Sequence, residues 1–450
     1  MKNDNIYVVK KVDNMKYRLI ELKVSGIKCV EKEIEIHFAK HNFGSSIFNE
    51  SAIKSIYGPN GSGKTAIISA FSIYKTLLTS DFPFKMDNYN DLLAELINKK
   101  TKNFFISVIF AVLNEDRIFR LKHTITVSKN VLNQYYVSHE TLHLLNTRLV
   151  ETKLIFETKN GSFSVNKLEN FTTTDPMVIS NNSVIKLCFN NAVQSKKSHL
   201  KRNNQIAILT EFFARNLFVV YGDRQDAHIG HFADWAFTNL DASTKFSGNE
   251  YSLNRLRETA KIVPGIRCFD VVFVSELEKY KKEIKKMCSF IKLLKQDLKD
   301  IKVECKPYDQ VCIVNLLFVY DGFEVDYDFE STGVKKLCLL FSAFVAAKNG
   351  CVVLIDEIDS NIHDTFLVKL FEYFTSYSNA QIISTTHNVE IMSVISSRSK
   401  SIDFLSNDNK VIPWIKTGRL SPATLYLKGR IKFVPFNLDS SEFAEVFNNE

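Results

Sequence analysis

The sequence predicts an α/β fold that combines a parallel sheet flanked by helices with a separate run of antiparallel strands. Strands and helices alternate over residues 311–405, which is the order typical of a parallel sheet. Residues 104–113 and 118–127 are strand-like runs on either side of a polar turn, which predicts an antiparallel pair. Residues 52–71 read as a buried strand, a glycine-rich loop and the start of a helix.

The glycine-rich loop has the spacing G-x-x-x-x-G-K-T, which is typical of proteins that bind nucleoside triphosphates. Its glycines let backbone N–H groups turn toward a phosphate, and the helix that follows adds the positive end of its dipole. Lys64 is placed to reach the β- and γ-phosphate oxygens, and the Thr65 hydroxyl to bind Mg²⁺. We therefore expect ATP and Mg²⁺ as cofactors, held by Gly58, Pro59, Asn60, Gly61, Ser62, Gly63, Lys64 and Thr65.

A second set of chemical residues follows the strands of the C-terminal part. Residues 352–357 are four apolar residues followed by two acids, so a buried strand carries the acids to its carboxyl end. Asp356 is expected to hold Mg²⁺, and Glu357 to orient or deprotonate the attacking water. His387 comes just after the next strand, where it can touch the γ-phosphate.

Ser331 and Gly333 precede a predicted helix. Ser331 is a good N-cap residue, and Gly333 would let a phosphate approach the backbone. A plain helix cap explains the same residues equally well.

Composition sets wide limits on function. The net charge is +8 over 450 residues, which permits contact with nucleic acid without requiring it. The eight cysteines are scattered without a C-x-x-C pair, so we expect no zinc site and a reducing compartment. No signal region and no run of membrane-spanning length is present, so we expect a cytoplasmic protein without membrane contact.

Three regions are expected along the chain. Residues 1–150 form an N-terminal lobe with the phosphate loop, and residues 311–450 form a C-terminal lobe with the acids and His387. Residues 151–310 are expected to be a largely helical insertion. Within it, apolar residues spaced three and four apart over 275–303 predict one long amphipathic helix. Packing of this helix on the body is favoured over a short coiled-coil contact with a second copy.

Together the motifs resemble those of an ABC-type ATPase head of the SMC-like and OLD-like branch. They occur in the expected order: Walker A at 58–65, a degenerate signature at 331–333, Walker B at 352–357, a D-loop at 359–361 and the H-loop at His387. The resemblance implies a mixed sheet with a phosphate-loop core plus an antiparallel β subdomain. It covers residues 15–145 and 310–405.

More narrowly, residues 355–363, residues 384–388 and the tail at 420–430 look like the stand-alone AAA-family ATPases of bacterial antiphage systems such as Septu and PARIS. In that group a separate effector, a nuclease or a toxin, is usually encoded next to the ATPase. The resemblance implies an ATPase that scaffolds and restrains such an effector. It also implies a homodimer or larger homo-oligomer, in which Ser331 and Gly333 of one copy meet the γ-phosphate on another.

Two departures from the family pattern imply slow turnover. The signature reads Ser-Thr-Gly-Val-Lys, whereas transporters have Leu-Ser-Gly-Gly-Gln. No Gln stands in residues 82–87, where we expect a Q-loop.

The main alternative is a DNA repair or recombination ATPase of the SMC/RecF type that acts directly on DNA. The modest charge and the lack of a long coiled coil favour the effector-controlling ATPase. A fused nuclease would need a further cluster of acids, and those after residue 400 are scattered. A transporter subunit would need a different signature.

Overall fold

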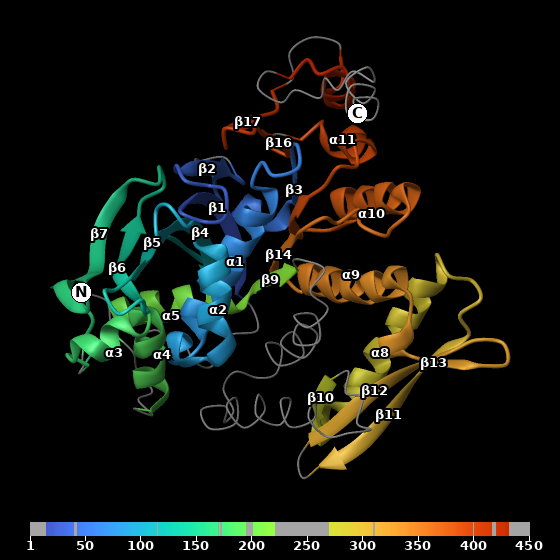
Figure 1. Ribbon diagram of the computed structural model, residues 1–450, viewed down its shortest axis with the longest axis horizontal. Coiled ribbons are helices and arrows are strands. Elements are labelled where there is room, and N and C mark those ends of the chain that lie inside the picture. Colours follow the sequence, from blue (N-terminus) through green and yellow to red (C-terminus); the bar gives the residue numbers. More distant parts are fainter. Residues whose placement is uncertain are drawn as a thin grey trace, which may run out of the picture.

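Within the residues that it describes, the computed structural model contains three β-sheets, with helices packed between and beside them (Figure 1). It describes residues 15–39, 43–114, 116–169, 171, 173–194, 201–220, 270–308, 311–398, 400–415 and 420–431. In Figure 1 the antiparallel sheet lies on the left, the core sheet runs through the centre and the small sheet lies at the lower right.

The antiparallel sheet has seven strands. In spatial order they are β2 (Ile34–His37), β1 (Lys16–Ser25), β4 (Asn103–Asn114), β5 (Arg117–Lys129), β6 (Tyr135–Leu145), β7 (Glu151–Lys159) and β8 (Ser162–Asn166). The predicted pair at 104–113 and 118–127 is confirmed as the β4–β5 hairpin, which closes with Asn114 opposite Arg117. Strands β6 and β7 pair with each other, so this sheet continues across the expected boundary at residue 150.

The core sheet has six strands, and all its pairings are parallel except that of the edge strand β17. In spatial order they are β17 (Val411–Pro413), β16 (Ile402–Leu405), β3 (Ala52–Tyr57), β15 (Gln381–Thr385), β14 (Val352–Ile355) and β9 (Leu217–Val220). The predicted parallel sheet is therefore confirmed. It draws β9 from the region expected to be a separate insertion.

Both faces of the core sheet are covered, which explains the unbroken apolar run of β14. Val352 and Leu354 pack into one hydrophobic cluster, with helix α1 (Lys64–Thr79) and the antiparallel sheet. Val353 and Ile355 pack into a second cluster on the opposite face, with helices α9 (Thr332–Lys348) and α10 (Asp364–Tyr377). Since successive strand residues point to opposite faces, a strand covered on both sides needs apolar residues at every position.

The other helices are short or of medium length. They are α2 (Asp87–Leu96), α3 (Pro176–Ser180), α4 (Val184–Gln194), α5 (Arg202–Arg215), α8 (Leu277–Lys292), α9 (Thr332–Lys348), α10 (Asp364–Tyr377), α11 (Glu390–Ile395) and α12 (Pro422–Leu427).

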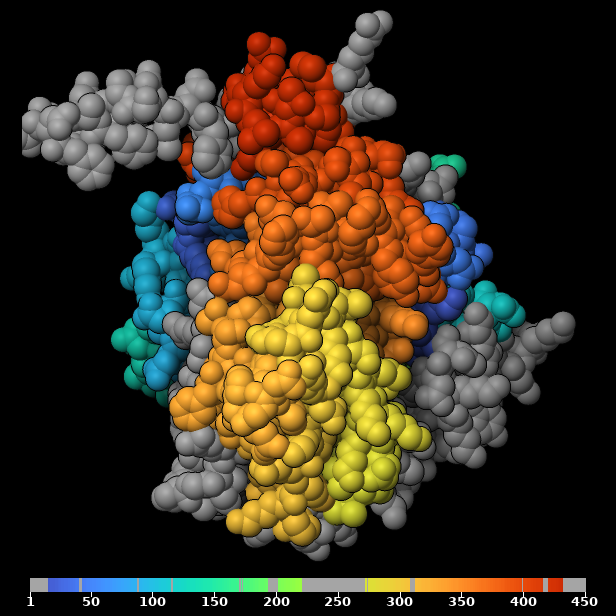
Figure 2. Space-filling model, turned by 90° about the vertical axis from the view of Figure 1, so that its right-hand side faces the viewer, coloured from blue at the N-terminus to red at the C-terminus, as the bar shows by residue number. Residues whose placement is uncertain are grey.

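The small sheet and α8 form a unit beside α9. Its strands are β10 (Asp270–Phe273), β12 (Val311–Val319), β11 (Asp300–Tyr308) and β13 (Glu324–Asp326). Figure 2 views this side of the molecule, with the small-sheet unit (yellow to light orange) below the residues after β14 (deeper orange) and the C-terminal residues (red) at the top.

The single long helix expected over residues 275–303 was wrong in its extent. Helix α8 ends at Lys292, and the chain then turns into β11, which pairs with β12 along its whole length. Leu298 and Ile301 are buried as their spacing suggested, but they lie outside the helix. The ladder of strand hydrogen bonds with β12 overrides the helical periodicity of this segment. The expected boundary at residue 310 accordingly falls within the β11–β12 hairpin.

A buried arginine and a glutamine join the antiparallel sheet to the core sheet. Arg18 donates hydrogen bonds to the carbonyl oxygens of Ile47 (2.8 Å) and Glu50 (2.6 Å), and also to that of Asn379. The side chain of Gln381 bonds both the N–H and the carbonyl of Leu19, each at 2.8 Å. These contacts fix the β1 strand against β15, and β15 leads directly to His387.

Candidate nucleotide site

The glycine-rich loop connects the end of β3 to the start of α1 with a backbone that requires glycine. Gly63 is the N-cap of α1 and has φ +103°, and a Cβ at this residue would lie 2.8 Å from the Val30 side chain. Gly61 has φ +81° and lies exposed at the loop tip. A Cβ on Gly58 would lie 2.4 Å from the carbonyl oxygen of Leu405. The loop is therefore held tightly by β16 and by the turn after β1.

Lys64 lies across the phosphate loop. Its Nζ donates hydrogen bonds to the carbonyl oxygens of Gly58 (2.8 Å) and Pro59 (3.0 Å). Burial lowers the pKa of Lys64, and the nearby carboxylates of Asp356 and Glu357 oppose that shift. The ammonium therefore lies near both acids and can exchange carbonyl partners for phosphate oxygens.

Three further loop residues, Ser62, Thr65 and Asn60, are predicted to hold the nucleotide. Ser62 Oγ is buried and has no hydrogen-bond partner among the described residues. Thr65 is half-buried on the first turn of α1, and Asn60 is exposed. Neighbouring segments also support the loop, since Asn409 donates to the carbonyl of Ser62 (2.9 Å).

Asp356 follows β14 and is buried. Its N–H donates to the carbonyl of Val220 (2.8 Å), and its carboxylate accepts a hydrogen bond from the Thr385 hydroxyl. Because β14 and β15 are parallel with Ile355 opposite Ser384, the residues after these strands meet at the same sheet edge. The expected position of Asp356 at a strand end is confirmed.

Glu357 has an unusual backbone conformation for a residue with a side chain, with φ +46°. Its N–H donates to Thr385 Oγ1 (2.8 Å), and its carbonyl accepts from Lys336 Nζ (2.9 Å) and from the N–H of Ser360 (3.0 Å). Its side chain is exposed at the sheet edge. Strained backbone of this kind persists where surrounding contacts hold it, and it often marks functional sites.

His387 lies at the same edge, just after β15. Its N–H donates to Asp359 Oδ2 (3.0 Å), and the other carboxylate oxygen of Asp359 is buried without a partner among the described residues. Burial and the charge of Lys64 lower the pKa of His387, against the opposing carboxylates of Asp359 and Glu357. Lys64, the acids after β14 and His387 therefore share one electrostatic environment.

The residues expected to form the signature lie at the N-terminus of α9. Ser331 is the N-cap, and its Oγ accepts a hydrogen bond from the N–H of Val334 (3.3 Å), so the predicted cap is confirmed. A Cβ on Gly333 would lie 3.4 Å from the carbonyl oxygen of Asn361. Within the described part of the chain, no hydrogen bond joins Ser331 or Gly333 to Lys64.

The segment where we expect a Q-loop lies at the far end of α1 from the phosphate loop. Residues 82–87 follow the C-terminal end of α1, and a helix of 16 residues places that end roughly 24 Å from the phosphate loop. On the side of β14 opposite β15 lies β9, which ends at Val220, next to Asp356. Residues 221–269 lie outside the described residues.

Sequence reasoning missed the roles of Thr385 and Lys336. Thr385 is the last residue of β15, and its hydroxyl connects Asp356 to Glu357. A hydroxyl at a strand end beside two acids was a usable signal. Lys336 had no such signal, because its reach to Glu357 depends on where α9 packs.

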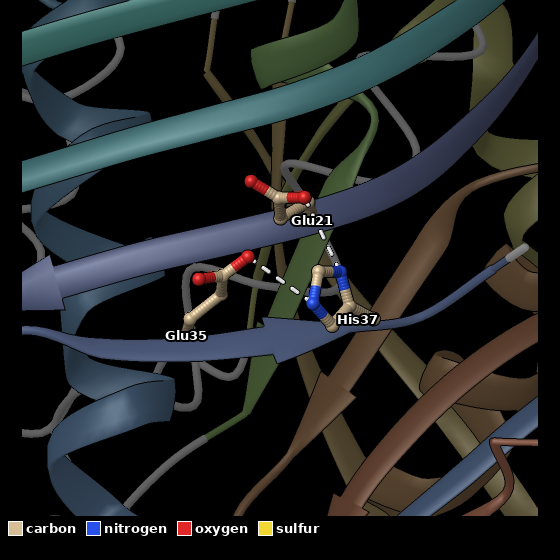
Figure 3. A group of neighbouring side chains, drawn as sticks. All are labelled: Glu21, Glu35 and His37. Atoms are coloured by element: carbon tan, nitrogen blue, oxygen red, sulfur yellow. Dashed lines mark ion pairs between the residues drawn. The ribbon is translucent and has the colours of Figure 1, made fainter. Parts of the chain in front are cut away.

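A separate ionisable cluster lies on the paired strands β1 and β2 of the antiparallel sheet (Figure 3). His37 Nδ1 lies 3.2 Å from Glu21 Oε2, and His37 Nε2 lies 3.1 Å from Glu35 Oε1. Lys23 Nζ lies 3.2 Å from the other oxygen of Glu35. Glu21 lies directly opposite His37 in the register of β1 and β2, so the cluster bridges these two strands. We assign this cluster to the pairing of β1 with β2.

A model of the RecF/RecN/SMC N-terminal domain family matches residues 21–411. The chain belongs to this family. All the motifs of the site lie inside the matched range, so they are those of an SMC-like ATPase head of the ABC type. The same match supports the SMC-like part of the predicted resemblance. It does not address the narrower likeness to antiphage ATPases.

A search among curated proteins gives no match. Among solved structures, the chain is similar to the Smc head domain of Pyrococcus furiosus with an extended coiled coil, bound to the C-terminal domain of ScpA. The identity is 15%, the match covers 88% of this chain and 96% of that chain, and the TM-score is 0.41. That likeness is too loose to assign individual residues. Among the described residues, no helix is both long and apolar enough to cross a membrane.

Proposed function

We propose that this chain is an ATPase whose nucleotide site is completed by a second copy of the chain. The nucleotide-site part of this proposal rests on one observation. Lys64, Asp356, Glu357 and His387 gather at one edge of the core sheet, around the phosphate loop.

The residues present fit a magnesium-bound nucleoside triphosphate. The space beside Gly61 is open. Among the described residues the buried Ser62 hydroxyl has no hydrogen-bond partner, and a phosphate oxygen would supply one. Thr65 and Asp356 would hold Mg²⁺, which neutralises charge on the phosphate oxygens when bound. Lys64 would pair with the phosphate in place of the Gly58 and Pro59 carbonyls.

Each remaining residue has a defined part in hydrolysis. Glu357 accepts a proton from the attacking water, whose oxygen bonds to the γ-phosphorus while the bond to the bridging oxygen breaks. ADP and phosphate leave as products. His387 lies near Lys64 and hydrogen-bonds the γ-phosphate. Its lowered pKa keeps the imidazole neutral near pH 7, so it can serve as a donor through one nitrogen.

The second copy would supply Ser331 and Gly333. These residues start a helix of 17 residues, and its N-terminal dipole favours an anion. Phe329, two residues before Ser331, is 66% exposed. It would give the same surface an apolar contact with the second copy. ATP would then join two heads, and hydrolysis would release them.

For the biological role, we propose that the ATPase restrains a separate effector, a nuclease or toxin, in a bacterial antiphage system. The motif resemblance at residues 355–363 and 384–388 supports this role. The described cysteines are free thiols, a usage typical of the reducing cytoplasm, where we place the protein. The family match is equally consistent with a repair ATPase of the SMC/RecF type that acts on DNA, so we keep that function as the second candidate.

The central test compares the wild type with Lys64→Ala and Glu357→Gln by nucleotide titration, phosphate release and light scattering. We expect Lys64→Ala to lose ATP binding, and Glu357→Gln to bind ATP, stop hydrolysis and remain a dimer. Lys75→Ala, on the same helix three turns later, is the matched control and should behave like the wild type. Normal affinity in Lys64→Ala, or wild-type hydrolysis in Glu357→Gln, would refute the site.

A second test separates the two biological roles. Purification from the native host with and without ATP should recover a stable second protein if the chain restrains an effector. A repair ATPase should instead show hydrolysis stimulated by DNA, with DNA binding that weakens steeply as salt rises. Stimulation by DNA without a protein partner would overturn the effector proposal.

A further inference from the structure

Lys336 connects the start of α9 to the backbone of Glu357. It lies on the second turn of the helix that Ser331 caps. Its Nζ donates a 2.9 Å hydrogen bond to the Glu357 carbonyl, across 21 residues of sequence. The contact therefore links two parts of one chain. The first is the start of α9, which we propose contacts the nucleotide of a second copy. The second is Glu357, which we propose acts on the nucleotide of its own copy.

The backbone of Glu357 needs such support, because φ +46° is unfavourable for a residue with a side chain. It is held from two directions. The Thr385 hydroxyl accepts from its N–H at 2.8 Å, and Lys336 and the N–H of Ser360 donate to its carbonyl. Thr385 belongs to the core sheet, whereas Lys336 belongs to α9. The Glu357 backbone is therefore held at its N–H by the core sheet and at its carbonyl by α9.

The first turns of α9 also touch the loop after Glu357. A Cβ at Gly333 would lie 3.4 Å from the carbonyl oxygen of Asn361, so the helix start packs against that loop. A displacement of Ser331 and Gly333 would therefore move Lys336 with them, since all three lie within two turns of one helix.

We propose that Lys336 is a positioning residue that sets the orientation of Glu357 according to the position of α9. In this arrangement, a nucleotide from a second copy that contacts Ser331 and Gly333 would adjust Glu357 of the same chain. This inference rests on the proposed function and deepens it, because it assigns a route by which one site regulates the other.

The neighbouring Lys335 provides a matched control. Its Nζ donates to the carbonyl of Asp328 (2.8 Å) and lies over the ring of Tyr327. It has the same charge and nearly the same exposure as Lys336, but its contacts are with the segment before α9. If Lys336 acted only through its positive charge at the helix start, removal of the charge of Lys335 or of Lys336 would have the same effect.

The experiment measures ATP affinity, kcat and KM for Lys336→Met, Lys336→Gln, Lys336→Arg and Lys335→Met. We expect Lys336→Met and Lys336→Gln to lower kcat about tenfold to a hundredfold, the range for a misplaced catalytic group, with affinity and KM within about twofold of the wild type. Lys336→Arg should recover most of the rate, because a guanidinium can donate to the same carbonyl. Lys335→Met should lower kcat less than Lys336→Met does, because Lys335 makes no contact with the Glu357 backbone among the described hydrogen bonds.

The outcomes separate this inference from the proposed function. If Glu357→Gln stops hydrolysis while Lys336→Met and Lys336→Gln retain the wild-type kcat, the positioning role is wrong and the proposed function stands. An equal loss in Lys335→Met, or a failure of Lys336→Arg to restore the rate, also overturns the positioning role. If Glu357→Gln hydrolyses ATP normally, the base assignment fails and this inference fails with it.

Discussion

The hydroxyl of Thr385 offers the sharpest test of how the site is held together. Thr385→Val keeps the shape of the side chain but removes two hydrogen bonds, one donated to the buried Asp356 carboxylate and one accepted from the Glu357 N–H. A hydrogen bond to a charged group contributes about 1.5–3 kcal/mol, and an unpaired buried N–H costs about 1–3 kcal/mol. Because the Glu357 side chain is exposed, water can reach its N–H in part, so we expect a total loss of about 2–4 kcal/mol.

Urea denaturation of the nucleotide-free protein measures this loss. A loss of about 3 kcal/mol moves the unfolding midpoint by about 1 M if the slope is about 3 kcal/mol per M. We also expect Thr385→Val to slow hydrolysis more than Thr385→Ser, which keeps the hydroxyl.

The adjacent Thr386 provides the control for this prediction. Its Oγ1 is also buried and accepts one backbone hydrogen bond, from the N–H of Asn388 (3.0 Å), but it contacts neither acid. Thr386→Val should therefore lose stability without a specific loss of kcat. Equal kcat losses in the two valine variants, or a Thr385→Val protein as stable and active as the wild type, would refute the reasoning.

Three further predictions address the loop, the sheet contact and His387. Gly63→Ala would put a side chain on a residue with φ +103° and bring its Cβ to 2.8 Å from the Val30 side chain. Nucleotide titration should therefore show an affinity that is at least about tenfold weaker. Arg18→Met leaves three backbone carbonyls without their donor, and urea denaturation should show a loss of about 2–4 kcal/mol, with Arg18→Lys in between. The pKa of His387 lies below its ordinary value of 6.5 because of burial and Lys64, so just below pH 6.5 the folded protein binds fewer protons than the unfolded chain. Stability should therefore fall as the pH drops through that window, and His387→Gln should reduce the slope in urea denaturation at pH 7.5 and pH 6.

The sequence predicted those parts of the site that depend on local patterns. These parts are the phosphate loop, the strand that ends in Asp356 and the cap at Ser331. Each lies within its own short segment of the chain, where the residue types directly limit the backbone conformation. Their positions in the structure agree with the prediction. The parallel order of β14 and β15 also followed from the alternation of strands and helices.

The rest of the site depends on contacts between distant segments. The role of Thr385 follows from the register that places Ser384 opposite Ile355, and the reach of Lys336 follows from the packing of α9. The same limit applies to the segment after Lys292, where apolar spacing was helical but pairing with β12 decided the outcome. Chain order alone likewise does not reveal that β9 lies beside β14.

The positions of the core-sheet strands along the sequence also affect when a nascent chain can bind ATP. Its strands come from three distant stretches of the chain, within residues 52–57, 217–220 and 352–413. Contacts between such distant segments form late, whereas the β4–β5 hairpin and its neighbours can form early. The phosphate loop emerges from the ribosome hundreds of residues before Asp356 and before β16, which supports it. A nascent chain therefore carries an incomplete loop for most of its synthesis, and ATP should stabilise only chains that extend through β16.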